Sequence, residues 1–416
     1  MQFHYNLAEA VITCITTIFT EHKYADKVIE KTLRSNPKWG SRDRGFIAEN
    51  VYDIVRYFKL YQHILQQCGE KDDNYFVLFA VHYHLKNKEI PTRSAWKHIN
   101  WEAVDAAVIR CSDDFAIHQS YTEWFLNKSI EQYSGVAYDL LKKMNEPARL
   151  ILRANTLKVR RNFLVNYFNE LKINTTELGE SALILDQKSN VFALDIFKEG
   201  CFEVQDFGSQ MISEFTQVEP GMRVIDACAG AGGKSLHLAM LMNNKGKILS
   251  LDVEEFKLIE LKKRARRNGV SIVETKIVDN QKTIKRLQGS ADVVLIDAPC
   301  SGSGVIRRNP DSKWKINNDK LNEMMLLQET ILQSYAELAK PGGVVVYATC
   351  SIWSEENENQ VLKFLMNNSN FELLEERKIS PLQYESDGYY MAKMKRTATP
   401  IDTELEKADD TVADDV

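Results

Sequence analysis

The sequence predicts an α/β fold in which a doubly wound, mostly parallel sheet follows an all-helical N-terminal region and a small α/β module. Three patterns lead to this fold class. Up to about residue 135, apolar side chains recur at helical spacing, as in residues 46–57. Between about 140 and 205 the apolar runs are short and of mixed period. From about 206 onward, apolar runs alternate with helix-length segments, an order typical of parallel sheets.

The length of 416 residues favours several domains over one compact core. We expect a helical domain (1–140), a small α/β module (141–205), a domain built on the doubly wound sheet (206–396), and an acidic tail that stays disordered (397–416). The apolar runs that should form the strands of the third part lie at 222–226, 247–251, 272–278, 291–297 and 343–349, with a late edge strand at 388–394.

Composition excludes several classes of protein. With 44% hydrophobic and 27% charged residues and no apolar run of membrane-spanning length, we expect no membrane partner. Residues 1–20 lack the basic start and cleavage site of a secretory signal. The seven cysteines form no CxxC pair, which argues against a zinc site or a disulfide framework. We therefore expect a cytoplasmic protein without a metal, and we expect it to be a monomer.

The net charge of −5 hides an uneven distribution. Residues 402–416 carry seven acids against one lysine, a net of −6, so the remainder of the chain is about +1. Residues 142–161 hold seven bases against one acid, and residues 257–267 hold six against one. Such runs are either solvated helix faces or contacts to a polyanion. We expect RNA as the partner, bound by the helical domain and the small module, with the first cluster contacting its phosphates.

A glycine-rich turn follows the first strand of the doubly wound domain. It comprises Asp226, Ala227, Cys228, Ala229, Gly230, Ala231, Gly232, Gly233 and Lys234. Glycines at a strand-to-helix turn let the backbone approach a ligand closely. A phosphate-binding loop of the Walker A type would need glycine at position 228, and Asp226 would repel phosphate. The acid instead suits a cofactor with a cationic amino-acid group and no phosphate, such as S-adenosylmethionine.

Further acids mark the ends of the following strands. Asp252 ends the second strand, where a carboxylate can accept hydrogen bonds from two ribose hydroxyls. Asp279 ends the third strand, within reach of an adenine amino group, and Asp297 ends the fourth. A single acid at the end of a strand is common. Because open parallel sheets bind ligands at the carboxyl edge of their strands, four such acids favour a cofactor site at this edge.

Two cysteines follow strands at the same edge. Cys300 comes shortly after Asp297, and Cys350 follows the strand at 343–349. A free cysteine is most often a small buried hydrophobe. Both of these cysteines, however, stand in loops beside polar residues and glycines, where a cofactor is expected.

Two thiols at this edge suit the methylation of cytosine at carbon-5. That carbon is a poor nucleophile until a thiolate adds to carbon-6 and makes carbon-5 enamine-like. A thiol with a pKa of ~8.5 is only slightly ionised at neutral pH, so the site must lower that pKa or supply a base. Asp297 could hydrogen-bond the amino edge of the cytosine, and Lys234 could offset negative charge nearby.

These segments resemble the NOL/NOP/Sun family of RNA cytosine-5 methyltransferases over residues 145–396. The resemblance rests on residues 226–234, 297–304, 307–311, 313–314 and 348–351, together with 153–158, 205–206, 209–210 and 387–390. More loosely, residues 41–57 resemble the NusB-like N-terminal domain of the bacterial enzyme that modifies small-subunit ribosomal RNA. The resemblance implies a Rossmann-like class I methyltransferase domain and 16S ribosomal RNA as the substrate.

The resemblance also implies roles for single residues. Cys350 would be the nucleophile and Cys300 the thiol that helps to release the product, with Asp297 and Lys234 as further catalytic residues. S-adenosylmethionine would be bound by Cys228, Ala229, Gly230, Ala231, Gly232, Gly233, Lys234, Asp252, Asp279 and Asp297. Many family members have proline where this chain has Ala231, a difference that keeps every polar contact.

Two other functions stay open on the residues alone. The same chemistry could act on transfer RNA, and the N-terminal domain would decide between the substrates. The chain could also be a catalytically silent RNA-binding factor for ribosome assembly, since fold does not fix function. Retention of both cysteines, Lys234 and the four acids argues against a silent factor.

Overall fold

The computed structural model describes residues 4–91, 96–187 and 189–398. The chain forms two compact units. The first unit comprises the chain up to Pro147 together with Val305–Asn317, and the second comprises the remainder. The predicted disorder of the tail at 397–416 falls almost entirely on residues from 399 onward, which lie outside the described residues.

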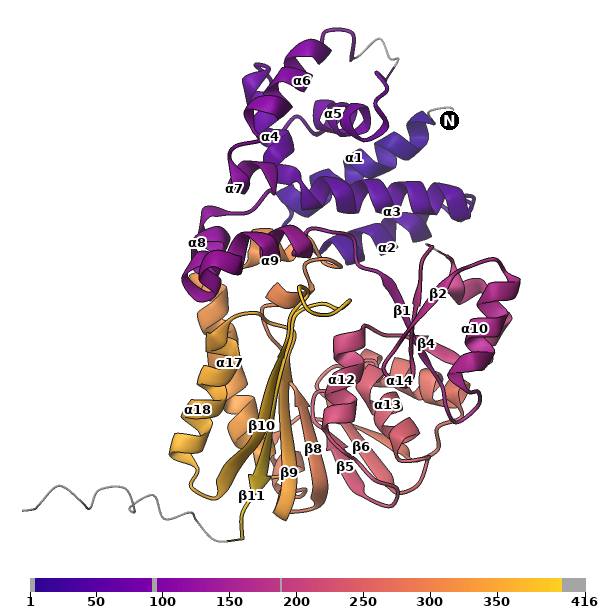
Figure 1. Ribbon diagram of the computed structural model, residues 1–416, viewed down its shortest axis with the longest axis vertical. Coiled ribbons are helices and arrows are strands. Elements are labelled where there is room, and N and C mark those ends of the chain that lie inside the picture. Colours follow the sequence, from indigo (N-terminus) through magenta and orange to yellow (C-terminus); the bar gives the residue numbers. More distant parts are fainter. Residues whose placement is uncertain (1–3, 92–95, 188, 399–416) are drawn as a thin grey trace, which may run out of the picture. The chain divides into compact units, whose positions relative to one another are not determined.

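The first unit is helical, as the spacing of its apolar residues predicts (Figure 1). Its helices are α1 (Tyr5–Thr20), α2 (Ala25–Ser35), α3 (Ser41–Arg56), α4 (Phe58–Gln67), α5 (Tyr75–Asn87), α6 (Trp101–Arg110), α7 (Phe115–His118), α8 (Glu123–Tyr133) and α9 (Ala137–Met144). In α3 the apolar residues at positions 47, 51, 54 and 55 are all buried. Asn74, Asn100 and Thr122 are the N-cap residues directly before α5, α6 and α8, and each side chain accepts a hydrogen bond from the backbone of the first turn.

A segment from far along the sequence completes the first unit. Residues 305–317, which contain α16 (Ser312–Lys315), pack with the helices instead of with the sheet that surrounds them in sequence. The fully buried Lys313 donates hydrogen bonds to the carbonyl of Arg56 at 2.7 Å and to Oδ1 of Asn145 at 3.0 Å. Trp314 Nε1 donates to the carbonyl of Val55 at 2.8 Å. The predicted domain 206–396 is therefore not continuous, because residues 305–317 belong to the helical unit.

The second unit begins with a small antiparallel sheet of order β2-β3-β1-β4. Its elements are β1 (Leu150–Ala154), α10 (Arg161–Glu170), β2 (Thr175–Leu178), β3 (Ala182–Leu185), α11 (Asp195–Lys198) and β4 (Phe202–Val204). A separate core fills this part, with Leu164 and Phe168 of α10 packed against Leu152 and Phe202. The short apolar runs between 140 and 205 therefore form a small α/β module, as predicted.

The large sheet has seven strands in the order β10-β11-β9-β8-β5-β6-β7. Its strands are β5 (Arg223–Asp226), β6 (Lys247–Asp252), β7 (Val273–Ile277), β8 (Ala291–Asp297), β9 (Ala339–Thr349), β10 (Phe371–Ile379) and β11 (Tyr389–Arg396). Strands β5 to β9 pair in parallel, and β11 is antiparallel to both of its neighbours. The mostly parallel, doubly wound sheet is thus confirmed.

Helices cover both faces of this sheet (Figure 1). The helices are α12 (Phe207–Phe215), α13 (Gly233–Leu241), α14 (Glu255–Asn268), α15 (Gln281–Lys285), α17 (Asn318–Ala336) and α18 (Glu358–Asn367). Leu332 of α17 and Phe364 of α18 share one core with Tyr390 of β11. Lys393, three positions further along β11, points to the other face, where its ammonium group lies over the ring of Phe215 in α12.

One strand lies elsewhere in the sheet than predicted. The run at 388–394 forms β11, which lies between β9 and β10 and is not an edge strand. The edge is β10, whose sequence Phe371–Ile379 carries five charged residues. A charged edge strand gives no apolar run, and exposed charges are a common protection of sheet edges. The pattern of apolar residues therefore predicted the buried strand β11 but gave no signal for the edge strand β10.

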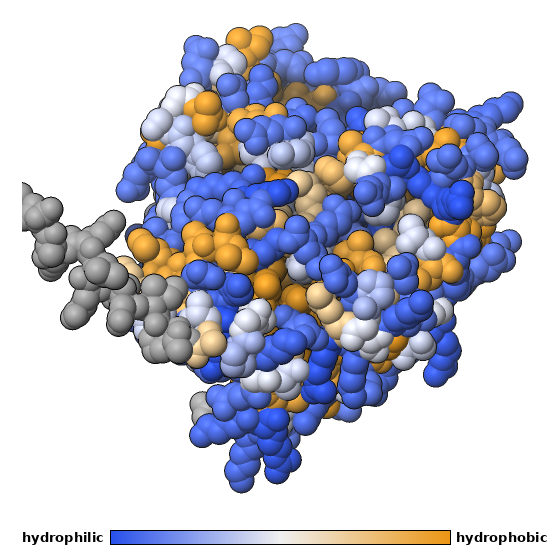
Figure 2. Space-filling view, turned by 60° about the horizontal axis from the view of Figure 1, so that its bottom comes forward, coloured by the Kyte–Doolittle hydropathy of each residue, from blue (hydrophilic) through white to orange (hydrophobic). Residues whose placement is uncertain are grey.

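The face shown in Figure 2 is mostly hydrophilic, with apolar side chains in separate groups. Within the part of the chain that the structure describes, no helix combines the length and the apolar character needed to cross a membrane.

Replacing Lys313 tests how much the inserted segment stabilises the helical unit. Lys313→Ala removes three hydrogen bonds from a fully buried amine and leaves a cavity. We expect the free energy of unfolding to fall by about 2–4 kcal/mol. Urea unfolding followed by tryptophan fluorescence measures this, because five of the six tryptophans lie in the first unit. The exposed Lys31→Ala should change stability by at most about 0.5 kcal/mol. Equal stability of the two variants would contradict the prediction.

Candidate active site

The carboxyl ends of the parallel strands meet at one edge of the large sheet, and the predicted site residues lie there. Asp226 ends β5, Asp252 ends β6 and Asp297 ends β8. Cys350 directly follows β9. The strands are neighbours in the order β9-β8-β5-β6, so residues that are distant in sequence share one edge.

The glycine loop between β5 and α13 leaves open space beside its backbone. Gly230 and Gly232 have φ angles of +53° and +86°, which favour glycine. A Cβ atom at Gly230 or Gly233 would meet nothing within 4 Å, whereas one at Gly232 would lie 2.4 Å from Leu261. The Gly230 amide donates to Oδ2 of Asp252 at 2.8 Å, which ties the loop to the end of β6. The loop is therefore shaped to let a ligand lie against bare backbone.

Asp226 lies beneath this loop. It is 1% exposed, and its Oδ2 accepts a hydrogen bond from Ser235 Oγ at 2.6 Å. Its Oδ1 has no hydrogen-bond partner among the described residues. Burial, reinforced by the charge of Asp297, raises the pKa of Asp226 to about 7. A cationic ligand bound nearby would favour the ionised form of this carboxyl.

Lys234 pairs with Asp297 across the same edge. Its Nζ lies 2.5 Å from Oδ2 of Asp297. Burial alone would lower the pKa of Lys234, but the adjacent carboxylate outweighs burial and raises it. Lys234 is therefore a fixed positive charge at the end of β8, and the nearby sulfur of Cys350 also interacts with it.

The two predicted cysteines face each other. The sulfurs of Cys300 and Cys350 are 3.2 Å apart. The hydrogen bond to Cys350 and burial together raise the pKa of Cys300 well above its usual range, and the charge of Cys350 adds to this effect. Cys300 is thus held as a neutral thiol that can donate to the sulfur of Cys350.

Other predicted residues lie at this edge with different surroundings. Burial raises the pKa of Cys228 well above its usual range, and the neighbouring carboxylates raise it further, so this thiol is inert. Asp279 lies two residues after β7, is exposed, and accepts a hydrogen bond from Asn280. Among the described residues, no group of three or more His, Cys, Asp or Glu side chains could hold a metal ion.

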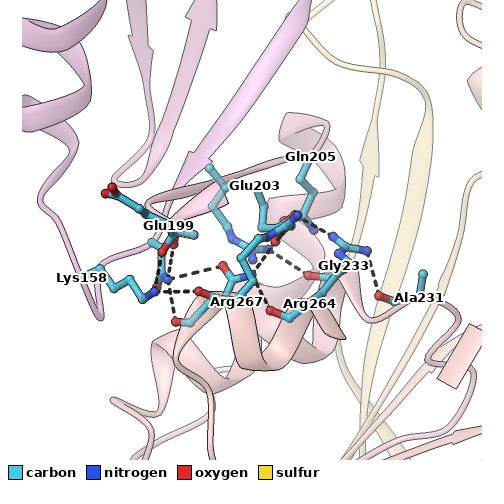
Figure 3. Close-up of polar contacts among 12 residues, drawn as sticks. Lys158, Glu199, Glu203, Gln205, Ala231, Gly233, Arg264 and Arg267 are labelled. Carbon is cyan, nitrogen blue, oxygen red and sulfur yellow. Dashed lines mark hydrogen bonds and ion pairs between the residues drawn. The ribbon is translucent and has the colours of Figure 1, made fainter. Parts of the chain in front are cut away.

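Two arginines that were not predicted for the site, the buried Arg153 and the partly buried Arg264, donate to carbonyls of the glycine loop; the contact of Arg264 with Ala231 is drawn in Figure 3. Arg153 of β1 donates to the carbonyl of Gly233 at 2.9 Å and to Oε1 of Gln205. Arg264 of α14 donates to the carbonyl of Ala231 at 2.8 Å. The two guanidinium groups therefore hold the carbonyls of Ala231 and Gly233. The space beside the backbone of Gly230 and Gly233 stays free.

Glu203 of β4 anchors the same network (Figure 3). It is 3% exposed and forms ion pairs with Arg264 and Arg267, and Asn268 donates to it at 2.5 Å. Burial alone would raise the pKa of Glu203, but the two arginines outweigh burial and lower it. The small module is thus connected to the glycine loop through buried charges.

Three members of the predicted basic cluster at 142–161 form hydrogen bonds within the protein. Arg153 is 2% exposed and cannot contact phosphate. Lys158 Nζ donates to the carbonyls of Glu199 and Arg267, and Arg161 donates to the carbonyl of Gly179. In the sequence these residues look like solvated bases, because charge density alone does not distinguish a buried guanidinium from an exposed one. The family resemblance of segment 153–158 is the feature of the sequence that could have indicated a structural role for Arg153 and Lys158.

Comparisons with known proteins agree with this fold. Residues 215–395 match the family model described as 16S rRNA methyltransferase RsmB/F, and residues 121–192 match that family's ferredoxin-like domain. The chain is 30% identical to a probable ribosomal RNA small subunit methyltransferase B of Bacillus subtilis over 71% of this chain and 70% of the relative. It is 31% identical to ribosomal RNA small subunit methyltransferase B of Shewanella oneidensis over 85% and 91%. The crystal structure of PH0851 superposes with a TM-score of 0.80 at 25% identity, covering 95% of this chain and all of that one.

Replacing Arg153 tests whether the small module supports the glycine loop. Arg153→Met keeps the apolar volume but removes the donor to the Gly233 carbonyl. We expect binding of S-adenosylmethionine, measured by calorimetry, to weaken by about ten-fold, since a charge-assisted hydrogen bond contributes about 1.5–3 kcal/mol. The exposed Arg160→Met is the control and should bind as the unchanged protein does. Unaltered affinity of Arg153→Met would show that the loop holds its shape without this arginine.

Proposed function

The chain belongs to the family of 16S ribosomal RNA methyltransferases RsmB/F, and we propose that it methylates carbon-5 of a cytosine in 16S ribosomal RNA. It is an RNA methyltransferase that uses S-adenosylmethionine. The observation that carries the finer proposal is the contact between the sulfurs of Cys300 and Cys350 at 3.2 Å. Methyl transfer to an amine or a hydroxyl would need no thiol, whereas carbon-5 of cytosine requires a nucleophile at carbon-6.

The cofactor, when bound, supplies an electrophilic methyl group on a sulfonium. We assign its binding to residues 228–234 and to the acids that follow the neighbouring strands. Asp252 is half-buried with lone pairs free to accept the ribose hydroxyls, and the exposed Asp279 would meet the adenine. The open faces of Gly230 and Gly233 support this assignment, because they leave room for a ligand against the backbone.

We assign the nucleophile to Cys350. Its sulfur lies 3.2 Å from the sulfur of Cys300 and interacts with the positive charge of Lys234. The thiolate is the nucleophilic form of a cysteine. Addition of that thiolate forms a carbon–sulfur bond at carbon-6 and makes carbon-5 electron-rich. Asp297, held in place by Lys234, would accept a hydrogen bond from the cytosine amino group.

Cys300 then serves the release of the product. Once the sulfur of Cys350 is bonded to carbon-6, two of the effects that raise the pKa of Cys300 weaken, namely the hydrogen bond between the two sulfurs and the charge of Cys350. Cys300 can therefore lose its proton to water and accept the proton from carbon-5. Loss of that proton restores the double bond and expels Cys350 as a thiolate.

The two relatives named above are described as methyltransferases of small-subunit ribosomal RNA, which favours 16S ribosomal RNA over transfer RNA. Bisulfite sequencing of total RNA from cells with and without the gene tests this substrate. The proposal requires one cytosine of 16S ribosomal RNA to lose its protection in the deletion strain. Loss at a transfer RNA position instead, or no loss at all, would support the transfer RNA enzyme or the silent assembly factor.

The cofactor assignment is tested at Asp252. Asp252→Ala removes both the anchor of the Gly230 amide and the acceptor for the ribose hydroxyls. We expect the affinity for S-adenosylmethionine to fall roughly ten- to a hundred-fold, from a loss of about 1.5–3 kcal/mol. Glu255→Ala, an exposed acid in the first turn of α14, is the matched control. An unchanged dissociation constant for Asp252→Ala would remove this residue from the binding site.

The two cysteines should behave differently when each is replaced. Cys350→Ala lacks the nucleophile, so we expect neither activity nor a covalent complex. Cys300→Ala still attacks and methylates, but the adduct decays slowly because the carbon-5 proton is not removed efficiently. Denaturing electrophoresis should therefore show a protein–RNA species with Cys300→Ala that is absent in the double variant. Trapping with Cys350→Ala instead would reverse the assignment, and full activity of both variants without trapping would rule out the covalent mechanism.

A further inference from the structure

A buried carboxylate that the mechanism does not yet use lies between the two cysteine loops. Glu356 ends a short 3-10 turn, Ser354–Glu356, and is fully buried. Its Oε1 accepts hydrogen bonds from the Ser301 amide at 2.7 Å and from Gln328 Nε2 at 3.1 Å. Its Oε2 accepts from Ser301 Oγ at 2.5 Å and from Ser351 Oγ. One carboxylate thus receives four donors.

The donors connect this carboxylate to both thiols. Ser301 directly follows Cys300, and Ser351 directly follows Cys350. The two loops leave different strands, β8 and β9, and also contact each other directly through the Gly304 amide, which donates to the carbonyl of Cys350 at 2.9 Å, and through the hydroxyls of Ser303 and Ser351 at 2.9 Å. Glu356 joins them through a single planar group, and Gln328 extends the connection by donating to the carbonyl of Pro299 at 3.0 Å.

Stability of the fold alone does not account for a carboxylate here. The four donors to Glu356 are neutral, so its charge is buried without the compensation of an ion pair. Burying a charge in this way is costly, and apolar residues of similar volume usually stabilise a core at least as well. A costly group that contacts the neighbours of both cysteines is better explained by what it does for them.

We propose that Glu356 is a positioning residue that sets the separation and orientation of the Cys300 and Cys350 thiols. The proposal rests on the cysteine chemistry proposed above. Glu356 acts through Ser301 and Ser351 and touches neither sulfur. Its charge has a second consequence, because it adds to the effects of Cys350 and burial that raise the pKa of Cys300.

The test uses the full chain and two readouts. The first is the rate at which Cys300→Ala forms its covalent RNA adduct in a single turnover, with and without Glu356→Gln. Because displacement of a reacting group by about 1 Å can cost 10²-fold in rate, we expect Glu356→Gln to slow adduct formation roughly ten- to a hundred-fold. S-adenosylmethionine affinity should stay unchanged, since Glu356 bonds none of the residues assigned to the cofactor. Glu355→Gln, the neighbouring acid, is the matched control and should form the adduct at the unchanged rate.

The second readout is the pH profile of methylation with Cys300 intact. Glu356→Gln removes a negative charge that raises the pKa of Cys300, so the rate should reach its plateau at a lower pH than in the unchanged protein. A residue that only stabilised the fold would lower activity without moving this profile. If Glu356→Gln does not fold, Ser301→Ala removes one connection alone and should slow adduct formation to a smaller extent.

The possible failures are distinguishable. If Cys300→Ala by itself forms no adduct, the covalent mechanism is overturned and this proposal with it. If Cys300→Ala forms the adduct and the added Glu356→Gln leaves both the rate and the pH profile unchanged, only the role of Glu356 is overturned. Parallel loss of cofactor affinity and adduct formation would likewise reduce Glu356 to a structural residue.

Discussion

The parallel pairing of β9, β8, β5 and β6 is the constraint on which the site depends. Parallel strands present their carboxyl ends at one edge, and each strand here ends in, or is directly followed by, a residue that we assign to the proposed site. Asp226, Asp252, Asp297 and Cys350 are spread over more than a quarter of the chain, and only this register makes them neighbours. A slip of one residue in any of these strands would turn its side chains to the other face.

The loops at this edge are irregular, so buried polar groups hold them. Arg153 and Arg264 fix the carbonyls of the glycine loop, and Glu356 connects the residues that follow the two cysteines. In each case a charged group bonds the backbone or a short side chain directly behind the reacting surface. The site surface is thereby left free, and the geometry is set from the interior, where competition from water is weakest.

The path of the chain joins the Cys300 loop to the helical unit. Gly304 still belongs to the second unit, where its amide donates to the carbonyl of Cys350 at 2.9 Å. The next thirteen residues fold with the helices, anchored by Lys313 and Trp314, before the chain returns at Asn318. The loop that carries Cys300 is therefore held by hydrogen bonds within the second unit up to Gly304, and the chain then continues directly into a segment of the first unit.

The sequence by itself determined the elements and the residues that follow them. Helical spacing located the first unit, and apolar runs located β5 to β9 and the acids and cysteines that come after them. These features are local, because the spacing of apolar residues in a helix or strand involves residues that are close together in the sequence. The glycine loop was recognisable for the same reason, since its backbone angles restrict which residues can occupy it.

Only the tertiary structure decided which charges are buried and which strand forms the edge. Arg153 looks like part of a solvated basic cluster, Glu356 like one of several acids, and Lys313 like an ordinary surface lysine. A charge can be buried only where partners satisfy it, and for these three residues the partners come mostly from distant parts of the chain. The same holds for β11, whose buried place beside β10 depends on a charged strand that gives no apolar pattern.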